Sequence, residues 1–229
     1  MNQAISLLDK WKKEPVATHN RASVFFSQDI ETHLAKWNGC TACPLGDRSR
    51  NHVGYDATVP ADTLADVLLI GEGPGKGEDN LGLPFVGVSG RFLRAAITNT
   101  GFTDLNVGFT NMVMCRPCDK MSGPNRTPDA VEVARCNVRL VELIKLVQPY
   151  IIILCGMVAG DSIGNRLRST MPGRIVQIQH PRFILEKGGA GSDIYPAYVH
   201  AVRQAMNQAH TMKGAFDHDQ RHNSFSNLR

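Results

Sequence analysis

The chain has 229 residues, which suits one α/β domain with extensions, or at most two domains. Its hydrophobic content of 42% is ordinary for a globular protein, and no apolar stretch is long enough to predict a membrane span. The formal net charge of +4 permits nucleic-acid binding without requiring it, and the N-terminal sequence MNQAISLLDKWKKEP lacks a signal-peptide layout, so we expect a cytoplasmic protein.

The two ends of the chain are expected to lie outside the main domain. Residues 1–36 are predicted to form a helical extension, with one helix starting near Asp29. Residues 211–229 lack apolar periodicity and are predicted to form a flexible tail, so the adjoining His210 is expected to be solvated and not to bind a metal. The domain itself is therefore expected to span residues 37–210.

Buried strands and amphipathic helices alternate between these ends. Strands are predicted over residues 66–71, 107–114, 150–155 and 174–179. Helices are predicted over residues 88–99, 128–147, 157–168 and 193–209. Because strands that alternate with helices pair in parallel, we expect an α/β fold: a three-layer α/β/α sandwich around a central, mainly parallel four-stranded sheet.

Cysteines provide the first chemical signal along the chain. Cys40 and Cys43 form a C-x-x-C pair in a loop bracketed by glycine and proline. In a cytosolic protein such a pair indicates a metal or redox site more than a structural disulfide. Cys115, together with Cys136 or Cys118, supplies two further thiols, and four thiolates suit either zinc or an iron–sulfur cluster.

A glycine-rich loop provides the second signal. The stretch from Gly71 to Gly90, GEGPGKGEDNLGLPFVGVSG, follows a predicted strand and precedes a predicted helix, where open α/β sheets bind ligands. It carries three acids, Glu72, Glu78 and Asp79, and one aromatic, Phe85. The loop lacks the third glycine of a dinucleotide fingerprint, and its lysine is not followed by Ser or Thr as in a P-loop.

A histidine at the end of the last predicted strand provides the third signal. His180 is followed by Pro181 and Arg182 and is expected at the same edge of the sheet as the glycine-rich loop. A lone histidine is usually structural. One that proline holds at the carboxyl end of a strand is functional about as often as it is structural.

These motifs together resemble the iron–sulfur uracil-DNA glycosylases, families 4 and 5 of the uracil-DNA glycosylase superfamily. The order C-x-x-C, GE-x-PG-x-x-ED-x-x-G-x-PFVG, TN-x-V-x-CRP, NR-x-P, Cys and HP runs across residues 40–181, with both ends of the chain outside it. The resemblance implies a monofunctional DNA glycosylase that flips uracil or a related modified base out of DNA and hydrolyses its N-glycosidic bond, leaving an abasic site. It implies DNA, single- or double-stranded, and the free base as partners, and we expect a monomer without membrane association.

The resemblance also implies a cofactor and catalytic residues. The ligands of a [4Fe–4S] cluster match Cys40, Cys43, Cys115 and Cys136, with zinc as the less favoured occupant. Glu72 falls where the family places an acid that polarises water, and Glu78 is the alternative acid in the same loop. His180 would donate a hydrogen bond to the uracil oxygen as negative charge develops.

Substrate and DNA contacts follow in the same way. Phe85 would stack on the flipped base and Asn111 would read its pyrimidine edge, beside a substrate-binding turn of Gly73, Pro74 and Gly75. Three basic residues flank the expected pocket, and at least one of them is expected to meet a DNA phosphate: Arg116, Arg126 and Arg182.

The chain departs from the family pattern in two places. CRP is followed by Cys118 and the insertion DKMSGP, so Cys118 competes with Cys136 as the fourth cluster ligand. HP is followed by Arg182 in place of the usual Ser, which leaves the damage preference open.

Three alternatives therefore stay beside the uracil-DNA glycosylase. One is an enzyme of the same fold that acts on a hypermodified, phage-type base. Another is a non-catalytic iron–sulfur protein that binds nucleic acid. The third is a redox protein that uses the dithiol of Cys40 and Cys43.

Overall fold

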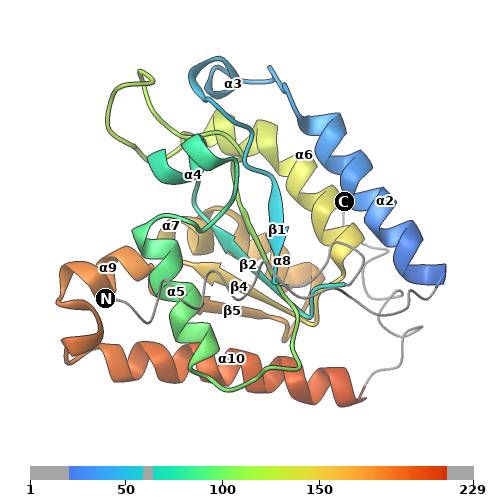
Figure 1. The fold of residues 1–229 in the computed structure, drawn as a ribbon, viewed down its shortest axis with the longest axis vertical. Helices are drawn as coiled ribbons and strands as arrows, with labels where there is room; N and C mark the ends of the chain where they lie inside the picture. The colour runs from blue at the N-terminus through green and yellow to red at the C-terminus, as the bar shows by residue number, and fades with distance from the viewer. Residues whose placement is uncertain (1–20, 59–63, 216–229) are drawn as a thin grey trace.

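The structure is a computed structural model that describes residues 21–58 and 64–215 (Figure 1). A five-stranded sheet lies at its centre in the order β1-β3-β2-β4-β5. The four parallel strands are β2 (Val67–Gly71), β3 (Val107–Asn111), β4 (Ile151–Cys155) and β5 (Ile175–Ile178). These confirm the predicted α/β fold and its mainly parallel sheet.

A fifth strand that the sequence did not predict lies at one edge of the sheet. Strand β1 (Tyr55–Ala57) pairs antiparallel with β3 and is only half-buried. Three residues are too short a run to show the alternation by which an edge strand is recognised. Strand β3 ends at Asn111, earlier than predicted, because the chain then bends and the Met114 carbonyl accepts the Val53 N–H at 2.7 Å.

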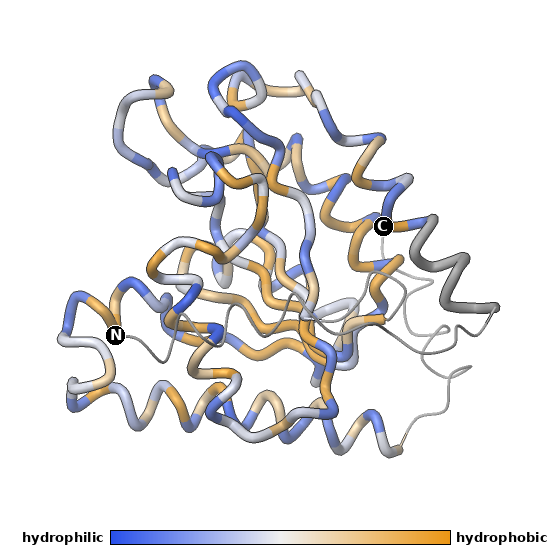
Figure 2. Tube along the Cα trace, viewed as in Figure 1, coloured by the Kyte–Doolittle hydropathy of each residue, from blue (hydrophilic) through white to orange (hydrophobic). Residues whose placement is uncertain are grey.

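Helices cover both faces of the sheet, giving the three predicted layers (Figure 1). One face packs on α5 (Val88–Thr98), α9 (Pro181–Glu186) and α10 (Tyr195–Ala215). The other packs on α6 (Ala130–Val147) and the segment from α7 (Met157–Ala159) to α8 (Asn165–Thr170). The central strands are apolar on both faces, as the orange tubes in Figure 2 show, and this is typical of a buried parallel sheet.

Helix α6 begins where the sequence predicts. Asp129 caps it by accepting the N–H of Glu132 at 2.8 Å, and the Glu132 carboxylate accepts the N–H of Asp129 at 2.9 Å. This reciprocal capping box satisfies two N–H groups that the first helical turn leaves without helical partners. The helix thereby gains a fixed start directly after the loop that carries the inserted residues.

The helix predicted over 157–168 is interrupted in the structure. A π-helical turn, Gly160–Gly164, separates α7 from α8. A side chain at Gly160 would clash with the amide of Gln177, so glycine is required where strand β5 lies against this turn. Three short helices were also missed, α3 (Leu45–Arg48), α4 (Lys76–Leu81) and α9, as was the 3-10 turn Gly189–Gly191.

Helix α10 is longer than predicted and corrects the expected start of the C-terminal tail. It runs to Ala215, and Lys213 within it forms an ion pair with Asp66 at 2.8 Å. His210 is 53% exposed, as expected for a solvated side chain, but it belongs to this helix, and its Nδ1 lies 2.9 Å from a carboxylate oxygen of Asp104. These partners could not be predicted, because both acids lie more than 100 residues away along the chain. The rest of the predicted tail, 216–229, lies outside the described residues.

Helix α2 (Arg21–Trp37) covers the end of the predicted N-terminal extension. It packs on the outer side of α6, where Ile30 is buried and the Trp37 indole donates to Glu142 at 2.8 Å (Figure 1). This part of the extension therefore belongs to the packed body, while residues 1–20 lie outside the described range. No helix within the described ranges combines the length and apolar character that crossing a bilayer requires.

Candidate active site

A cavity of about 510 Å³ opens at the carboxyl edge of the parallel sheet. Glu72 follows β2, Asn111 ends β3 and His180 follows β5, and all three line this cavity. Parallel strands end at the same edge, so residues far apart in sequence meet there. The turn Gly73, Pro74 and Gly75, together with Glu78, Phe85, Arg126 and Arg182, also lines the cavity.

Gly71 lets two of the predicted substrate-binding side chains approach each other. Strands β2 and β3 pair so that Gly71 lies opposite Asn111. A Cβ at Gly71 would clash with Oδ1 of Asn111 and would lie 2.9 Å from Cζ of Phe85. Both the amide and the ring therefore occupy the space that a larger residue would fill.

Phe85 forms an aromatic floor in the cavity. Its ring centroid lies 5.6 Å from that of Phe109 on β3, and the residue is 7% exposed. Its backbone has a φ of 56°, in the left-handed region that residues other than glycine rarely adopt. Gly90 permits this turn, because a Cβ there would clash with the Phe85 backbone.

Asn111 is held at the end of β3 by a buried arginine. The carbonyl oxygen of Asn111 accepts a hydrogen bond of 2.5 Å from Nη2 of Arg139, and the Thr110 hydroxyl accepts one of 3.1 Å from Nη1. Arg139 is 1% exposed and Asn111 is 4% exposed. The backbone that carries the Asn111 amide is therefore fixed from inside the protein.

The three acids of the glycine-rich loop have different surroundings. Glu72 is half-buried, and burial raises its pKa, against a hydrogen bond with the side chain of Thr127. Glu78 accepts the Gly87 N–H at 2.7 Å and so braces the loop on which Phe85 lies. Asp79 is buried and accepts the Arg50 N–H at 2.8 Å, which makes it structural.

His180 caps α9 through its own ring. Its Nδ1 accepts the Arg182 backbone N–H at 3.1 Å, so the neutral imidazole carries its proton on Nε2. Burial lowers the pKa of His180, and the positive charge of Arg182 lowers it further. The residue therefore offers a neutral N–H donor at the cavity it lines.

The predicted DNA contact of Arg116 is at odds with its position. Arg116 is 2% exposed, and its guanidinium donates to Oδ1 of Asn125 at 2.6 Å and to the Met121 carbonyl at 2.8 Å, with a third bond to the Gly123 carbonyl. These bonds close the inserted loop around the side chain. Arg116 therefore organises the loop and does not face a phosphate; charge alone in the sequence does not reveal such burial.

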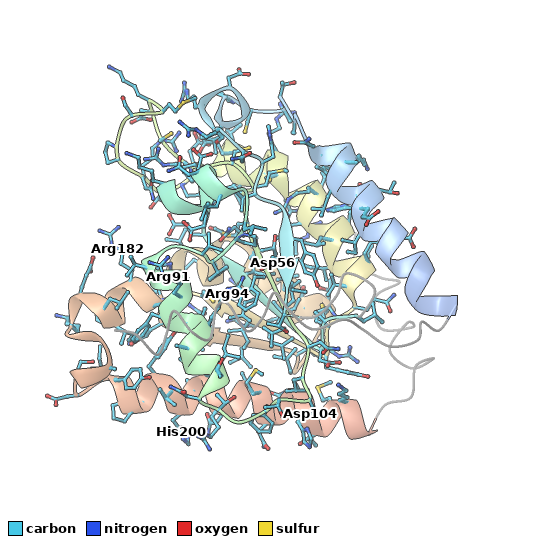
Figure 3. The ribbon with its side chains drawn as sticks, viewed as in Figure 1. Asp56, Arg91, Arg94, Asp104, Arg182 and His200 are labelled. Carbon is cyan, nitrogen blue, oxygen red and sulfur yellow. The ribbon has the colours of Figure 1, made fainter. Side chains whose placement is uncertain are left out.

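The other two arginines do line the cavity. Arg126 forms ion pairs with Asp119 at 2.8 Å and with Glu132 at 2.7 Å, and its side chain is 28% exposed. The side chain of Arg182 is 71% exposed and pairs with Glu186 one helical turn later (Figure 3). Arg182 is thus the more accessible cation of the two.

Comparison with known proteins agrees with this geometry. Residues 60–205 match the family model described as the uracil DNA glycosylase superfamily. The chain belongs to that superfamily. It is therefore a DNA glycosylase, an enzyme that hydrolyses the N-glycosyl bond between a base and its sugar.

Several relatives of this glycosylase carry a more specific name. The chain is 31% identical over 166 residues to a Type-4 uracil-DNA glycosylase of Pyrobaculum aerophilum. This alignment covers 65% of the chain and 80% of that protein. It is 37% identical over 120 residues to the Type-4 uracil-DNA glycosylase of Thermotoga maritima (52% of the chain, 58% of the relative). A third such enzyme, from Archaeoglobus fulgidus, is 32% identical over 126 residues (55% and 59%).

A second, smaller cavity of the glycosylase is lined by cysteines. Cys40, Cys43, Cys115 and Cys136 all line it, beside Trp37 and Glu132. Cys118 does not; it is buried elsewhere, with its Sγ directed at the Arg48 carbonyl at 3.8 Å.

The surroundings of this cavity disfavour the ionised, thiolate form of its cysteines. Burial, together with the neighbouring Cys136, Cys43 and Cys40, raises the pKa of the Cys115 thiol to about 12. In the part of the chain that is described, no three His, Cys, Asp or Glu side chains are already arranged to hold a metal ion. Four soft sulfur donors around one cavity nevertheless fit a cluster in ligand type and number.

Other lining residues of the glycosylase pocket were not predicted. Asn125 and Thr127 come from the loop that Arg116 organises, and Ser89 comes from the first turn of α5. The motif NR-x-P does contain Asn125, so its pattern was a usable signal. Ser89 and Thr127 occupy ordinary loop and helix positions that carry no such signal.

Proposed function

We propose that this glycosylase removes uracil from DNA. The observation that carries the proposal is the convergence of Glu72, Phe85, Asn111 and His180 on one cavity at one edge of the sheet. An aromatic floor, an amide, a neutral N–H donor and a carboxylate are the groups that excision of a flipped pyrimidine needs. The names of the relatives, Type-4 uracil-DNA glycosylase, support the same substrate.

Base recognition is assigned to Phe85 and Asn111. The ring of Phe85 stacks on the flipped base, since every base presents an aromatic face. The side-chain amide of Asn111 offers one donor group and one acceptor, which match an acceptor oxygen and the N–H of the uracil edge. The fixed backbone of Asn111 supports this role, because an amide that discriminates between bases must be held in place.

Bond cleavage is assigned to His180 and one acid. As the bond between C1′ and the base breaks, its electron pair passes to the base, and Nε2–H of His180 hydrogen-bonds the oxygen on which negative charge develops. A water molecule adds its oxygen to C1′, and the proton that it releases passes to the uracil anion, which leaves an abasic sugar and the free base. Glu72 orients that water and stabilises the cationic sugar.

The choice of Glu72 over Glu78 rests on their different partners. The carboxylate of Glu78 already accepts the N–H of Gly87 within the protein. Glu72 is half-buried at the end of β2, with a raised pKa, as is common for an acid at a reactive site. No lysine is present among the described residues that line the pocket, which fits a monofunctional enzyme that uses water as the nucleophile.

DNA contact is assigned to Arg182, with Arg126 as a second contact. Both arginines line the pocket. The Arg182 side chain is exposed, so it can contact a phosphate without any rearrangement of the fold. The enzyme is proposed to act as a monomer in the cytoplasm. Its partner is DNA and its product is free uracil. The domain that carries this function is taken as residues 37–210, extended by the packed helix α2 and by the end of α10.

A [4Fe–4S] cluster is assigned to Cys40, Cys43, Cys115 and Cys136. Their four sulfurs line one cavity, whereas Cys118 points elsewhere. A bound cluster would supply cross-linking between the N-terminal loop, the segment after Asn111 and helix α6. Zinc is the alternative occupant, because four thiolates suit both.

The cluster assignment is tested by metal analysis of matched variants. Anaerobically purified protein should be brown and contain iron; C136A should lose the iron and C118A should keep it. Colourless protein with one zinc per chain would replace the cluster by zinc. Iron kept in C136A but lost in C118A would give the fourth position to Cys118.

The activity is tested with purified protein and a panel of oligonucleotides. Uracil, hypoxanthine and modified pyrimidines are presented in single and double strands, and abasic sites are measured as alkali-labile breaks. Release of uracil is expected, with H180A as the inactive control. Release from hypermodified pyrimidines alone would favour the phage-base alternative, and DNA binding without any base release would favour a non-catalytic binder.

A further inference from the structure

The turn that carries Phe85 has an unusual backbone. Its left-handed φ of 56° is disfavoured for a phenylalanine, so surrounding contacts must hold it. Gly90 makes room for this turn, but an absent side chain does not fix a conformation. The contacts that do fix it come from two arginines on α5.

Three successive carbonyls of the turn accept hydrogen bonds from these arginines. Nη2 of Arg94 donates to the Pro84 carbonyl at 3.0 Å, and Nε donates to the Phe85 carbonyl at 3.1 Å. Nη1 of Arg91 donates to the Val86 carbonyl at 2.5 Å. The planar guanidinium of Arg94 therefore fixes two adjacent peptide groups on either side of the left-handed residue.

Arg94 is itself held from the edge strand β1. Its Nη2 lies 2.7 Å from a carboxylate oxygen of Asp56, and its side chain is 14% exposed (Figure 3). Its guanidinium carbon lies 3.7 Å from the ring centroid of Phe109, the ring against which Phe85 packs. Burial lowers the pKa of Arg94, and the charge of Asp56 acts in the opposite direction.

We propose that Arg94, anchored by Asp56, is a positioning residue that holds the Phe85 ring in its base-stacking orientation. Arg94 does not line the pocket and acts through the Pro84–Phe85 backbone and the Phe109 ring. The proposal rests on the proposed uracil-DNA glycosylase function, because it assigns Phe85 to the flipped base. It makes a three-residue edge strand part of the machinery of substrate recognition.

The expected effect falls on binding of the extruded base. R94M keeps the apolar stem and removes every donor, and should weaken binding of a duplex that carries a non-hydrolysable 2′-fluoro-deoxyuridine by about tenfold, a part of what base stacking contributes. Binding of undamaged DNA should stay unchanged. R94K keeps the charge beside Asp56 but lacks the planar fork, and D56N removes the anchor; both should give smaller losses.

A double-mutant cycle separates positioning from general destabilisation. In an F85A background, R94M should cause little further loss, because the ring that Arg94 positions is gone. K213M breaks the Lys213–Asp66 ion pair of 2.8 Å at the far end of α10 and serves as the control; it should lower thermal stability without changing affinity for the analogue. Equal losses from R94M with and without Phe85 would overturn the proposal.

A spectroscopic readout keeps the proposal testable without activity. With 4-fluoro-phenylalanine at position 85, the wild-type protein should give one sharp ¹⁹F resonance, and R94K and D56N should broaden or split it while K213M leaves it sharp. Unchanged spectra in R94K and D56N would overturn the proposal. If the wild-type enzyme releases no uracil, the proposed function fails, and this measurement still decides whether Arg94 orients the ring.

Discussion

The base pocket and the cysteine cavity are organised by different means. In the pocket, Asn111 is fixed by Arg139, Glu78 by the Gly87 N–H and His180 by the Arg182 N–H. In the cysteine cavity, the four thiols are brought to one space by packing between α6 and two loops, without an arrangement that already holds a metal among the described residues. The pocket is preorganised by hydrogen bonds of the chain itself.

The difference indicates what each region requires from outside the chain. Preorganised donors do not need to reorient as charge develops, which is the main source of their catalytic effect. Thiolates that lie together without a cation repel one another, so we expect the cysteine region to depend on the proposed cluster to become fixed. Experiments can test this difference between the two regions. It fails if the pocket also depends on the proposed cluster, and it is supported if a change affects one region alone.

The largest expected effect is that of H180A on the pocket. Removing a preorganised donor to a developing oxyanion costs about 10²–10³ in rate, so single-turnover release of uracil should slow by that order. DNA affinity should change little, whereas the free energy of unfolding should fall by about 1 kcal/mol, because the ring of His180 also caps α9. The matched control is H200A, at an exposed histidine on α10, which should retain full activity (Figure 3).

A somewhat smaller effect is expected from N111D. A carboxylate cannot donate a hydrogen bond to the uracil oxygen, which is then left buried without a partner. The rate of uracil release should therefore fall by about 10- to 100-fold. The same variant should gain activity towards cytosine, whose exocyclic amine needs an acceptor. Competition between uracil- and cytosine-containing oligonucleotides measures the shift; an unchanged preference would remove Asn111 from base recognition.

Much of the pocket was predictable from local sequence. Gly71, Glu72, Phe85 and His180 occur in or beside motifs next to strand ends, where a strand-to-loop pattern indicates a ligand site. The supporting groups were not predictable, because Asp56 and Arg94 lie 38 residues apart and Arg139 lies 28 residues from Asn111. A charge in the sequence does not reveal whether it ends buried, as Arg116 illustrates.

Removing the iron of the proposed cluster should affect the cysteine region more than the pocket. After chelation under oxidising conditions, amide hydrogen exchange should rise in residues 38–54, while β2 and β3 stay protected by their buried ladder. Uracil release should fall less than in H180A. Equal loss of protection in β3 would break the comparison, because the pocket would then depend on the cluster as well.

The pH dependence should reflect the neutral state of His180. Burial and Arg182 hold its pKa below the ordinary value of 6.5, with Glu186 opposing them. Protonation of Nδ1 would break the bond from the Arg182 N–H, so the neutral form operates above the folded-state pKa and is lost as pH falls through it. Activity should therefore stay level as the pH is lowered to 6.5. It should decline only at lower pH, as the pH falls through the lowered pKa of His180; a decline centred above 6.5 would contradict this assignment.

The smallest expected effect is that of R182A on DNA affinity. Loss of one phosphate contact should reduce the slope of log affinity against log salt by about one unit. E186Q is the control, because it breaks the ion pair with Arg182 and leaves the arginine in place. An unchanged slope in R182A would transfer the DNA contact to other residues.

The loop closed by Arg116 is held from within by that one side chain. Its chain folds back on a single guanidinium, and Arg126 N–H donates to the Pro117 carbonyl at 2.9 Å across its base. The residues between Cys118 and Asn125 thus form a loop that is fixed at its base and from within. The exposed Ser122 at its tip is accordingly a suitable position for attaching a fluorophore or a tether to this enzyme.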